Sequence, residues 1–233
     1  MGMAQPTQSG FLIVATGLLA EARIASGRGV RAIAGGGEAR RLAAEIDRAI
    51  GDGGRAILSF GMAGGLEPNL ATGTVVIATE VVCGGERFTT DAAWTARLRA
   101  ALPESTCGAV AGVDAPVASS LGKEALHAAT GAAAADMESH IAGRAAARAS
   151  VPFAILRVIA DPAERVLPQA AVMGLRADGR PDVAAVLRSV ARNPAQLAAL
   201  ARVAGDARHA MAALARCKRR LGPGLGFARV DGG

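Results

Sequence analysis

The sequence predicts an α/β protein with three layers, in which a mixed, mostly parallel twisted sheet carries helices on both faces. Two observations predict this class. Short apolar runs, such as residues 11–15, 55–60 and 151–159, have the length and composition of buried strands. They alternate with segments such as residues 38–50, whose apolar residues recur at helical spacing. Alternation of this kind is typical of a largely parallel sheet with helices packed on its faces.

In the first half of the chain, glycines separate the predicted elements. Three glycines over residues 35–37 end one strand and precede a helix in which Leu42, Ile46 and Ile50 share one face. A glycine-rich turn over residues 61–65 is expected to end the third strand. We therefore expect strands at residues 11–15, 30–34, 55–60 and 74–82, and helices at residues 18–26, 38–50 and 91–101.

In the second half, short strands lead into longer helices. Pro152 stands at the start of an apolar run, where its missing N–H is tolerated. Asn193 and Pro194 break the long C-terminal helical stretch. We expect strands at residues 106–113, 132–136 and 151–159, and helices at residues 138–149, 182–192 and 195–221.

Bulk properties indicate one domain. The 233 residues, 51% of them hydrophobic, are enough for one large core, and no repeat or linker divides them. We expect a single domain over residues 1–221 with a helical C-terminal extension, then a flexible glycine-rich tail over residues 222–233. Neither the three cysteines nor the three histidines have metal-ligand spacing, so no metal is expected. The first apolar run is too short to span a bilayer and lacks the features of a signal peptide, which indicates a cytoplasmic protein.

Carboxylates stand at the ends of two predicted strands. Asp161 follows the strand over residues 151–159, and Asp136 and Glu138 follow the strand over residues 132–136. Because ligands bind beyond the carboxyl ends of strands in open α/β sheets, these side chains are candidates for a site. Arg157, inside an apolar strand, needs a charged partner. The alternative is that these acids only cap a turn and complement a helix dipole, and spacing alone leaves both readings open.

Four segments carry a resemblance to a known family: S-F-G-M-A-G-G-L (59–66), T-G-T-V-V (72–76), A-D-M-E-S (135–139) and V-P-F-A-I-L-R-V-I-A-D (151–161). In this order and spacing they resemble the purine nucleoside phosphorylase and methylthioadenosine nucleosidase superfamily. The D-M-E-S-H segment and the long tail are most similar to the hopanoid-associated phosphorylases. The resemblance implies a purine nucleosidase or nucleoside phosphorylase with that family's fold. It would release adenine from adenosylhopane, giving ribosylhopane, in bacterial hopanoid side-chain biosynthesis.

The resemblance also implies roles for particular residues. Asp161 would be the general acid that protonates the departing purine, and Glu21 would orient the attacking water. Glu138 would hold the ribose hydroxyls, with Met137 packed against the sugar. The remaining substrate-binding positions that it implies are Asp136, Met62, Ala63, Gly64, Val117 and Arg157.

Departures from the family's pattern bear on the nucleophile and the substrate. Ser59 stands where the phosphorolytic branch has an arginine, which favours water as nucleophile. Phosphate remains the alternative co-substrate, and no other cofactor is expected. Ala160 replaces a serine beside the acid, so the orientation of Asp161 must come from elsewhere. Short connections after Glu21 and Val82 favour an open sugar end, which suits a nucleoside that carries a bulky lipid.

Charge and family suggest the partners. The net charge is +6 and residues 216–220 form a basic run, which allows peripheral contact with the inner membrane. The favoured alternative is that the C-terminal helix packs on the sheet and that the charge reflects an arginine-rich composition. Aromatic residues make up only 3%, too few for a platform that binds nucleic acid. The resemblance implies a homo-oligomer that acts on a lipid nucleoside. Two alternatives stay open: an enzyme for small purine nucleosides such as methylthioadenosine, and a non-catalytic basic protein that binds membranes or nucleic acid.

Overall fold

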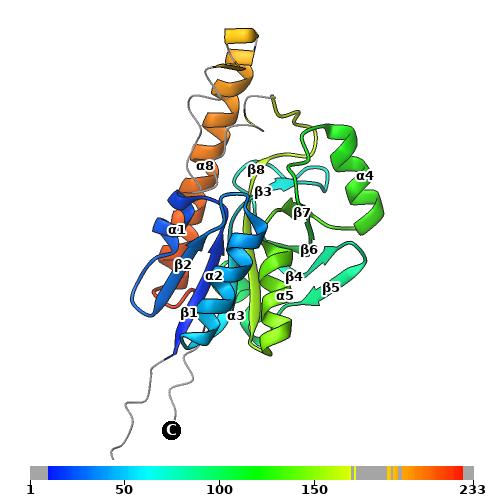
Figure 1. Cartoon of the computed structure of the whole chain (residues 1–233). Coiled ribbons are helices and arrows are strands. Elements are labelled where there is room, and N and C mark those ends of the chain that lie inside the picture. The colour runs from blue at the N-terminus through cyan, green and yellow to red at the C-terminus, as the bar shows by residue number, and fades with distance from the viewer. Residues whose placement is uncertain (1–9, 169–170, 172–187, 190, 194–195, 228–233) are drawn as a thin grey trace, which may run out of the picture.

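Figure 1 presents the computed structural model of the chain, which describes residues 10–168, 171, 188–189, 191–193 and 196–227. Within these residues a sheet of eight strands carries helices on both faces, so the predicted α/β class is confirmed. The strands are β1 (Phe11–Thr16), β2 (Val30–Ala34), β3 (Gly54–Gly65), β4 (Val75–Cys83), β5 (Glu86–Thr89), β6 (Thr106–Gly112), β7 (Ala134–Asp136) and β8 (Phe153–Asp161). The helices are α1 (Leu19–Ala25), α2 (Ala39–Gly51), α3 (Ala92–Ala101), α4 (Ser120–Thr130), α5 (Ser139–Ala149) and α8 (Leu197–Leu221).

The sheet is mixed and mostly parallel. Its strands pair in the order β2-β1-β3-β7-β6-β4-β5, and β8 pairs with both β3 and β4. The strands β3, β8, β4, β6 and β7 therefore form a closed ring. Parallel pairs outnumber antiparallel pairs by five to three. At one end of the ring, Gly64 of β3 pairs with Asp161 of β8, and it also pairs with Ala135 of β7.

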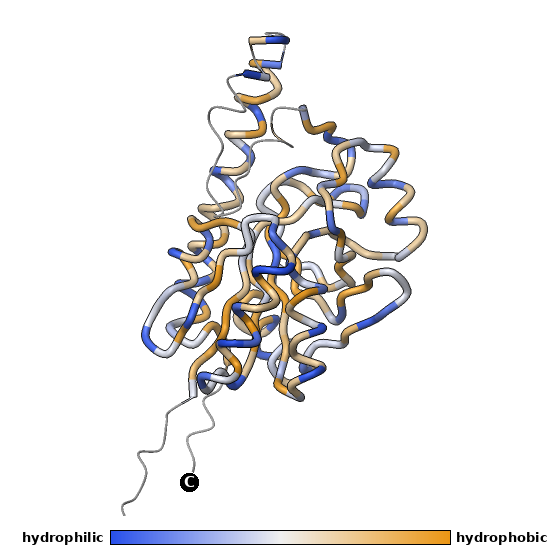
Figure 2. The backbone as a smooth tube through the Cα atoms, viewed as in Figure 1, coloured by the Kyte–Doolittle hydropathy of each residue, from blue (hydrophilic) through white to orange (hydrophobic). Residues whose placement is uncertain are grey.

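Two apolar cores lie on opposite faces of the sheet, because successive residues of a strand point to opposite sides. Ile13 of β1 packs in the core that includes Leu42 of α2, whereas its neighbour Leu12 packs in the core of Leu98 (α3) and Leu214 (α8). Figure 2 shows that the central strands are largely hydrophobic along their length. This pattern is expected for strands that are buried on both faces.

The strand β3 continues through the glycine-rich segment, so the prediction of a turn over residues 61–65 is wrong. Gly61 pairs with Arg157, and Gly65 pairs with Ala134. The glycine permits close approach rather than a turn: a Cβ atom at Gly61 would lie 2.7 Å from Nη1 of Arg157 and 2.9 Å from Oε1 of Glu21. The segment therefore brings two charged side chains against the backbone of one strand.

Neither β5 nor α4 is predicted from the sequence. The helix α4 begins after Ser119, whose hydroxyl accepts a hydrogen bond from the N–H of Gly122, and it ends at Gly131 with φ of 68°. Both are ordinary helix-end signals. However, Lys123 is the only buried residue of α4, so this helix lacks the buried apolar face whose spacing predicts a helix.

The segment after α8, residues 222–227, is packed on the body of the protein. Leu225 is fully buried, its carbonyl accepts a hydrogen bond from Nε1 of Trp94 (3.1 Å), and the ring of Phe227 lies 4.9 Å from that of Trp94. The prediction of a flexible tail over residues 222–233 therefore needs correction for residues 222–227. Residues 228–233 lie outside the described residues, as does most of the helix predicted over residues 182–192. None of the described helices is long and apolar enough to cross a membrane.

Candidate functional site

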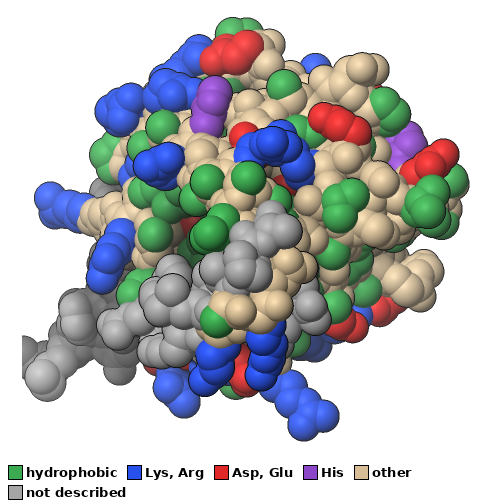
Figure 3. Space-filling view, turned by 90° about the horizontal axis from the view of Figure 1, so that it is seen from above, with side chains coloured by type: hydrophobic (Ala, Val, Ile, Leu, Met, Phe, Trp, Pro, Cys, Tyr) green, Lys and Arg blue, Asp and Glu red, His purple; other side chains and the backbone are tan. Residues whose placement is uncertain are grey.

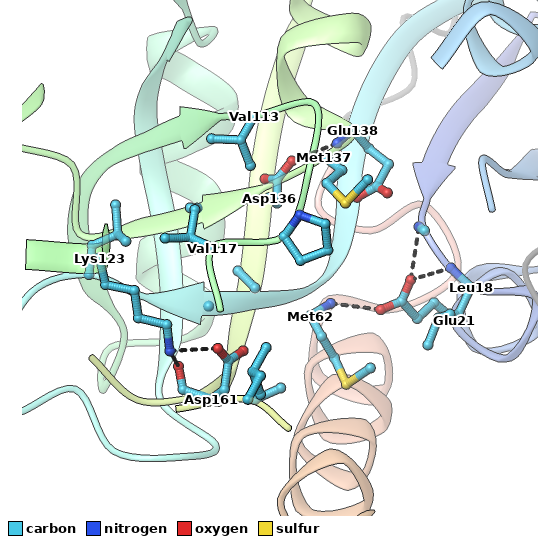
Figure 4. Close-up of a pocket in the computed structure, with 18 residues that line it drawn as sticks. Leu18, Glu21, Met62, Val113, Val117, Lys123, Asp136, Met137, Glu138 and Asp161 are labelled. Carbon is cyan, nitrogen blue, oxygen red and sulfur yellow. Dashed lines mark hydrogen bonds and ion pairs between the residues drawn. The ribbon is translucent and has the colours of Figure 1, made fainter. Parts of the chain in front are cut away.

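A pocket lies where the ends of β3 and β8 meet the start of α1 and the connection from β7 to α5 (Figure 4). It encloses about 240 Å³. Apolar side chains make up much of the lining, and the charged groups in it are the carboxylates of Glu21, Asp136, Glu138 and Asp161 and the ammonium group of Lys123. A mostly apolar pocket with a few convergent polar groups is the usual form of a small-molecule site.

Glu21, in the first turn of α1, is held from three sides. Its Oε2 accepts hydrogen bonds from the backbone N–H groups of Gly17 (2.9 Å) and Leu18 (2.8 Å), and its Oε1 accepts one from Met62 of β3 (2.7 Å). The side chain is almost fully buried. Burial raises the pKa of Glu21 above its ordinary value, although the three N–H donors and Arg157 act in the opposite direction. A fixed carboxylate with a raised pKa is suited to accept a proton near neutral pH.

Arg157 lies behind the pocket wall rather than in it. Its side chain is fully buried, and its Nε lies 2.8 Å from Oδ2 of Asp136 as an ion pair without hydrogen-bond geometry. Its Nη1 lies 3.4 Å from Oε2 of Glu138, and its Nη2 donates a hydrogen bond to Oγ of Ser59 (2.5 Å). Arg157 is not among the residues that line the pocket. The structure therefore places Arg157 against the acidic residues Asp136 and Glu138 and outside the lining of this pocket, where a substrate-binding residue was expected.

Asp136 is both a helix cap and a partner of Arg157. Its Oδ1 accepts hydrogen bonds from the N–H groups of Glu138 (2.8 Å) and Ser139 (2.6 Å) at the start of α5, and its Oδ2 accepts one from the Ser139 hydroxyl (2.5 Å). The capping alternative thus applies to Asp136, although it also lines the pocket. With both oxygens engaged, Asp136 fixes the backbone that carries Glu138.

Glu138 is buried among charges. A Cβ atom at Gly17 would lie 2.9 Å from its Oε1, which places the carboxyl group against the loop before α1. Burial raises the pKa of Glu138 to about 8, the negative charges of Asp136 and Glu21 add to the rise, and Arg157 opposes it. Glu138 therefore carries its proton over much of the neutral range.

The raised pKa of Glu138 predicts that the free protein loses stability as pH rises. Between pH 4.5 and about 8 the unfolded chain has released this proton and the folded protein has not. The folded state then binds more protons, so the free energy of unfolding falls over this window. We expect Glu138→Gln to flatten the fall, measured by urea unfolding at several pH values. An unchanged slope in the variant would contradict the assignment.

Asp161, at the end of β8, is paired with a lysine that the sequence does not single out. Its Oδ2 lies 2.6 Å from Nζ of Lys123, which is 1% exposed. Burial raises the pKa of Asp161, while the positive charge and hydrogen bond of Lys123 lower it. Figure 4 shows the pair on the side of the pocket away from Glu21 and Glu138. A buried amine needs a charged partner, but the sequence around Lys123 does not show that it is buried.

The pocket brings together most of the residues predicted for the site. It is lined by Glu21, Asp136, Glu138 and Asp161, and by Met62, Ala63, Gly64, Val117 and Met137. Arg157 is the exception. The structure adds apolar lining residues that the sequence prediction did not include, among them Leu18, Leu66, Val113, Pro116 and Leu167.

The fold and the pocket define an α/β protein that has an acidic, partly apolar small-molecule site at the strand ends. The chain belongs to the phosphorylase superfamily, whose family model matches residues 15–203. This match confirms the predicted superfamily. No curated protein matches the sequence.

Solved structures share the fold at low sequence identity. A 5′-methylthioadenosine/S-adenosylhomocysteine nucleosidase from Colwellia psychrerythraea, in complex with adenine, has a TM-score of 0.61 at 16% identity, covering 78% of this chain and 96% of its own. The futalosine hydrolase of Helicobacter pylori has a TM-score of 0.60 at 17% identity, covering 79% and 98%. The nucleosidase from S. pneumoniae, with a transition-state inhibitor, has a TM-score of 0.58 at 20% identity, covering 76% and 96%.

Proposed function

We propose that this protein is an enzyme that hydrolyses the N-glycosidic bond of a purine nucleoside, and that its substrate is adenosylhopane. Adenine would be released and ribosylhopane formed. The observation that carries the proposal is the placement of two carboxylates at separate sides of one pocket, Glu21 beside α1 and Asp161 at the end of β8. Breaking a glycosidic bond needs an acid at the leaving group and a base at the nucleophile.

The solved relatives support the reaction class. Two of them are 5′-methylthioadenosine/S-adenosylhomocysteine nucleosidases, and one of those is in complex with adenine. A purine leaves poorly as an anion, so an acid such as Asp161 assists by protonating the ring. Glu138, which keeps its proton over much of the neutral range, would hold the ribose hydroxyls by both donating and accepting hydrogen bonds. A non-catalytic basic protein would have no need of buried carboxylates, which are costly to maintain.

Water is favoured over phosphate as the nucleophile because the described pocket is acidic. Four carboxylates line it, and Lys123 is the one cationic side chain among its described lining residues. The Lys123 ammonium is already paired with Asp161. Ser59, where the phosphorolytic branch has an arginine, is buried and bound to Arg157. A phosphate dianion would therefore find no unpaired cationic side chain among the described lining residues.

A large apolar substituent on the sugar fits the surroundings of the pocket. The volume of the pocket, about 240 Å³, is below the roughly 300–1,000 Å³ of sites for drug-sized ligands. A polycyclic hydrocarbon on the sugar would therefore extend beyond the pocket. Among the described residues, the large apolar side chains that are exposed are Leu121, Val166 and Leu197. Leu121 is two residues from Lys123, and Val166 precedes Leu167 of the lining.

We include peripheral contact with the inner membrane and a homo-oligomeric state in this proposal. A hopanoid substrate resides in lipid, and Figure 3 shows basic side chains around the face seen from above, with apolar ones between them. The basic run at the end of α8 is a weaker candidate for lipid contact. Within it, Lys218 binds the carbonyls of Ala25 and Pro223, and Arg220 pairs with Glu104.

The proposal is tested by incubating the protein with adenosylhopane in mild detergent, with and without phosphate, and following adenine and the sugar product by chromatography. We expect release of adenine without phosphate, and free ribosylhopane as the second product. Methylthioadenosine is assayed in parallel. Asp161→Asn, purified in the same way, controls for contaminating nucleosidases.

Two results would redirect the proposal. An absolute requirement for phosphate, with a sugar phosphate as product, would assign phosphorolysis. A much higher kcat/KM for methylthioadenosine than for adenosylhopane would assign small nucleosides, which is the alternative substrate class. Absence of adenine release from either nucleoside would remove the enzymatic proposal altogether.

A further inference from the structure

Lys123 is the one lysine in the described pocket, and it is unusually well fixed. Its Nζ lies 2.6 Å from Oδ2 of Asp161. It also donates hydrogen bonds to the backbone carbonyls of Pro162 (2.8 Å), Arg165 (3.2 Å) and Asp161 itself (3.3 Å). The side chain rises from the buried side of α4 and is 1% exposed. Every proton of the ammonium group therefore has an acceptor.

The carboxylate contact goes beyond what is needed to anchor the chain after β8. The only other lysine of the sequence, Lys218, also ties two segments together, and it does so through carbonyls alone: its Nζ donates to Ala25 (2.9 Å) and Pro223 (3.0 Å). Lys123 adds to such carbonyl bonds an ion pair with the carboxylate that faces the pocket. Ala160, beside it, has no hydroxyl with which to orient Asp161.

We propose that Lys123 is a positioning residue that acts through Asp161, and that the two side chains together hold the proton that passes to the departing purine. The inference rests on the proposed function and deepens it. Among the described residues, the polar contacts of the Asp161 side chain use Oδ2 alone, which leaves Oδ1 for the substrate. Lys123 thereby holds Asp161 in one orientation and keeps a proton within 2.6 Å of it.

The proton balance of the step is simple. As the bond between C1′ and the purine nitrogen breaks, its electron pair goes to the base, and the purine ring takes a proton from Asp161. The Lys123 ammonium passes a proton to Asp161 in turn. Water adds to C1′ and gives its own proton to Glu21. Solvent then restores the proton of the pair and removes that of Glu21, so that nucleoside and water become base and sugar.

The pair predicts an unusual pH dependence. An ammonium group gives up its proton only well above pH 7, whereas a lone carboxyl, even a buried one, does so at lower pH. The wild-type protein is therefore expected to keep its acid protonated into the alkaline range. Without Lys123, Asp161 would have to serve as the acid by itself, and activity would be confined to lower pH.

The test compares Lys123→Gln with Lys218→Gln over pH 5–10, measuring kcat and KM for adenine release. The glutamine amide can still donate to the carbonyls, which preserves the fold. We expect Lys123→Gln to lose activity by about 100-fold at pH 9 and to approach wild type near pH 5.5, with KM unchanged. Lys218→Gln is expected to follow the wild-type profile. An equal loss at all pH values, or no loss, would overturn the inference.

A second measurement does not depend on how well Lys123→Gln folds. Because the chain has two lysines, ¹⁵N-lysine labelling gives two Nζ signals, and Lys218→Gln identifies the one from Lys123. We expect Asp161→Asn to move the titration of Lys123 to lower pH and to leave that of Lys218 in place. An unmoved Lys123 titration would exclude the pair. This signal is read without substrate, so it remains informative if adenine release, and with it the proposed function, fails.

Discussion

Asp161→Asn is expected to lower kcat for adenine release by about 10²–10⁴-fold, the usual contribution of a general acid. The amide keeps the size of the side chain and cannot pass on a proton. It also leaves the Lys123 ammonium without its carboxylate, which adds a cost in stability. The measurement is steady-state kinetics of adenine release, with KM as a check on binding.

The matched control for this substitution is Asp136→Asn. Asp136 also lines the pocket, but both its oxygens are engaged by the start of α5 and by Arg157. Its replacement is expected to lower the melting temperature more than Asp161→Asn does. If Asp161→Asn retains full kcat after correction for folded protein, Asp161 is not the acid.

Glu21→Gln is expected to lower hydrolysis by about 10²–10⁴-fold as well, because an amide cannot take the proton of the attacking water. The Glu21 carboxylate accepts hydrogen bonds from Gly17, Leu18 and Met62. A glutamine must turn its NH₂ group towards at least one of these donors. We therefore expect a loss of about 1–3 kcal/mol in the free energy of unfolding in addition.

Azide separates the loss of the base from a loss of structure. It is an anionic nucleophile and needs no base, so added azide is expected to restore adenine release in Glu21→Gln and to give an azido sugar. It is not expected to rescue Asp161→Asn, where the leaving group lacks its proton. If azide does not restore adenine release in Glu21→Gln, Glu21 acts in substrate binding instead of base catalysis.

Much of the fold follows from the sequence because most of its strands are short apolar runs. The runs that became β1, β4 and β8 are predicted within two residues of their observed ends. The exception is informative. A glycine-rich sequence normally marks a turn, but residues 61–65 stay in β3 because their backbone pairs with β8 and β7. Gly61 and Gly64 leave room instead for the charged side chains of Arg157, Glu21 and Asp161.

The candidate site, like the fold, contains some residues that the sequence reveals and others that it does not. The acids at the ends of β7 and β8 are visible from the sequence because they follow apolar strands directly. Lys123 is not, because nothing within α4 distinguishes a lysine that points inwards from one in solvent. Its importance depends on contacts with residues 38 to 42 positions away. The place of Arg157 behind the pocket wall is likewise a tertiary property.

The strand β3 has a consequence for how this protein can vary. Its Ser59 hydroxyl holds Arg157, its Met62 amide holds Glu21, and its Gly64 lies against the carboxyl group of Asp161. One extended segment thus sets the spacing between Glu21 and Asp161, which lie at separate sides of the pocket, and holds Arg157 behind its wall. Because shifting a strand by one residue reverses the direction of its side chains, an insertion or deletion within β3 would disturb all three together. Substrate preference can therefore diversify through the loops at the pocket's edge, whereas the length of this strand is constrained.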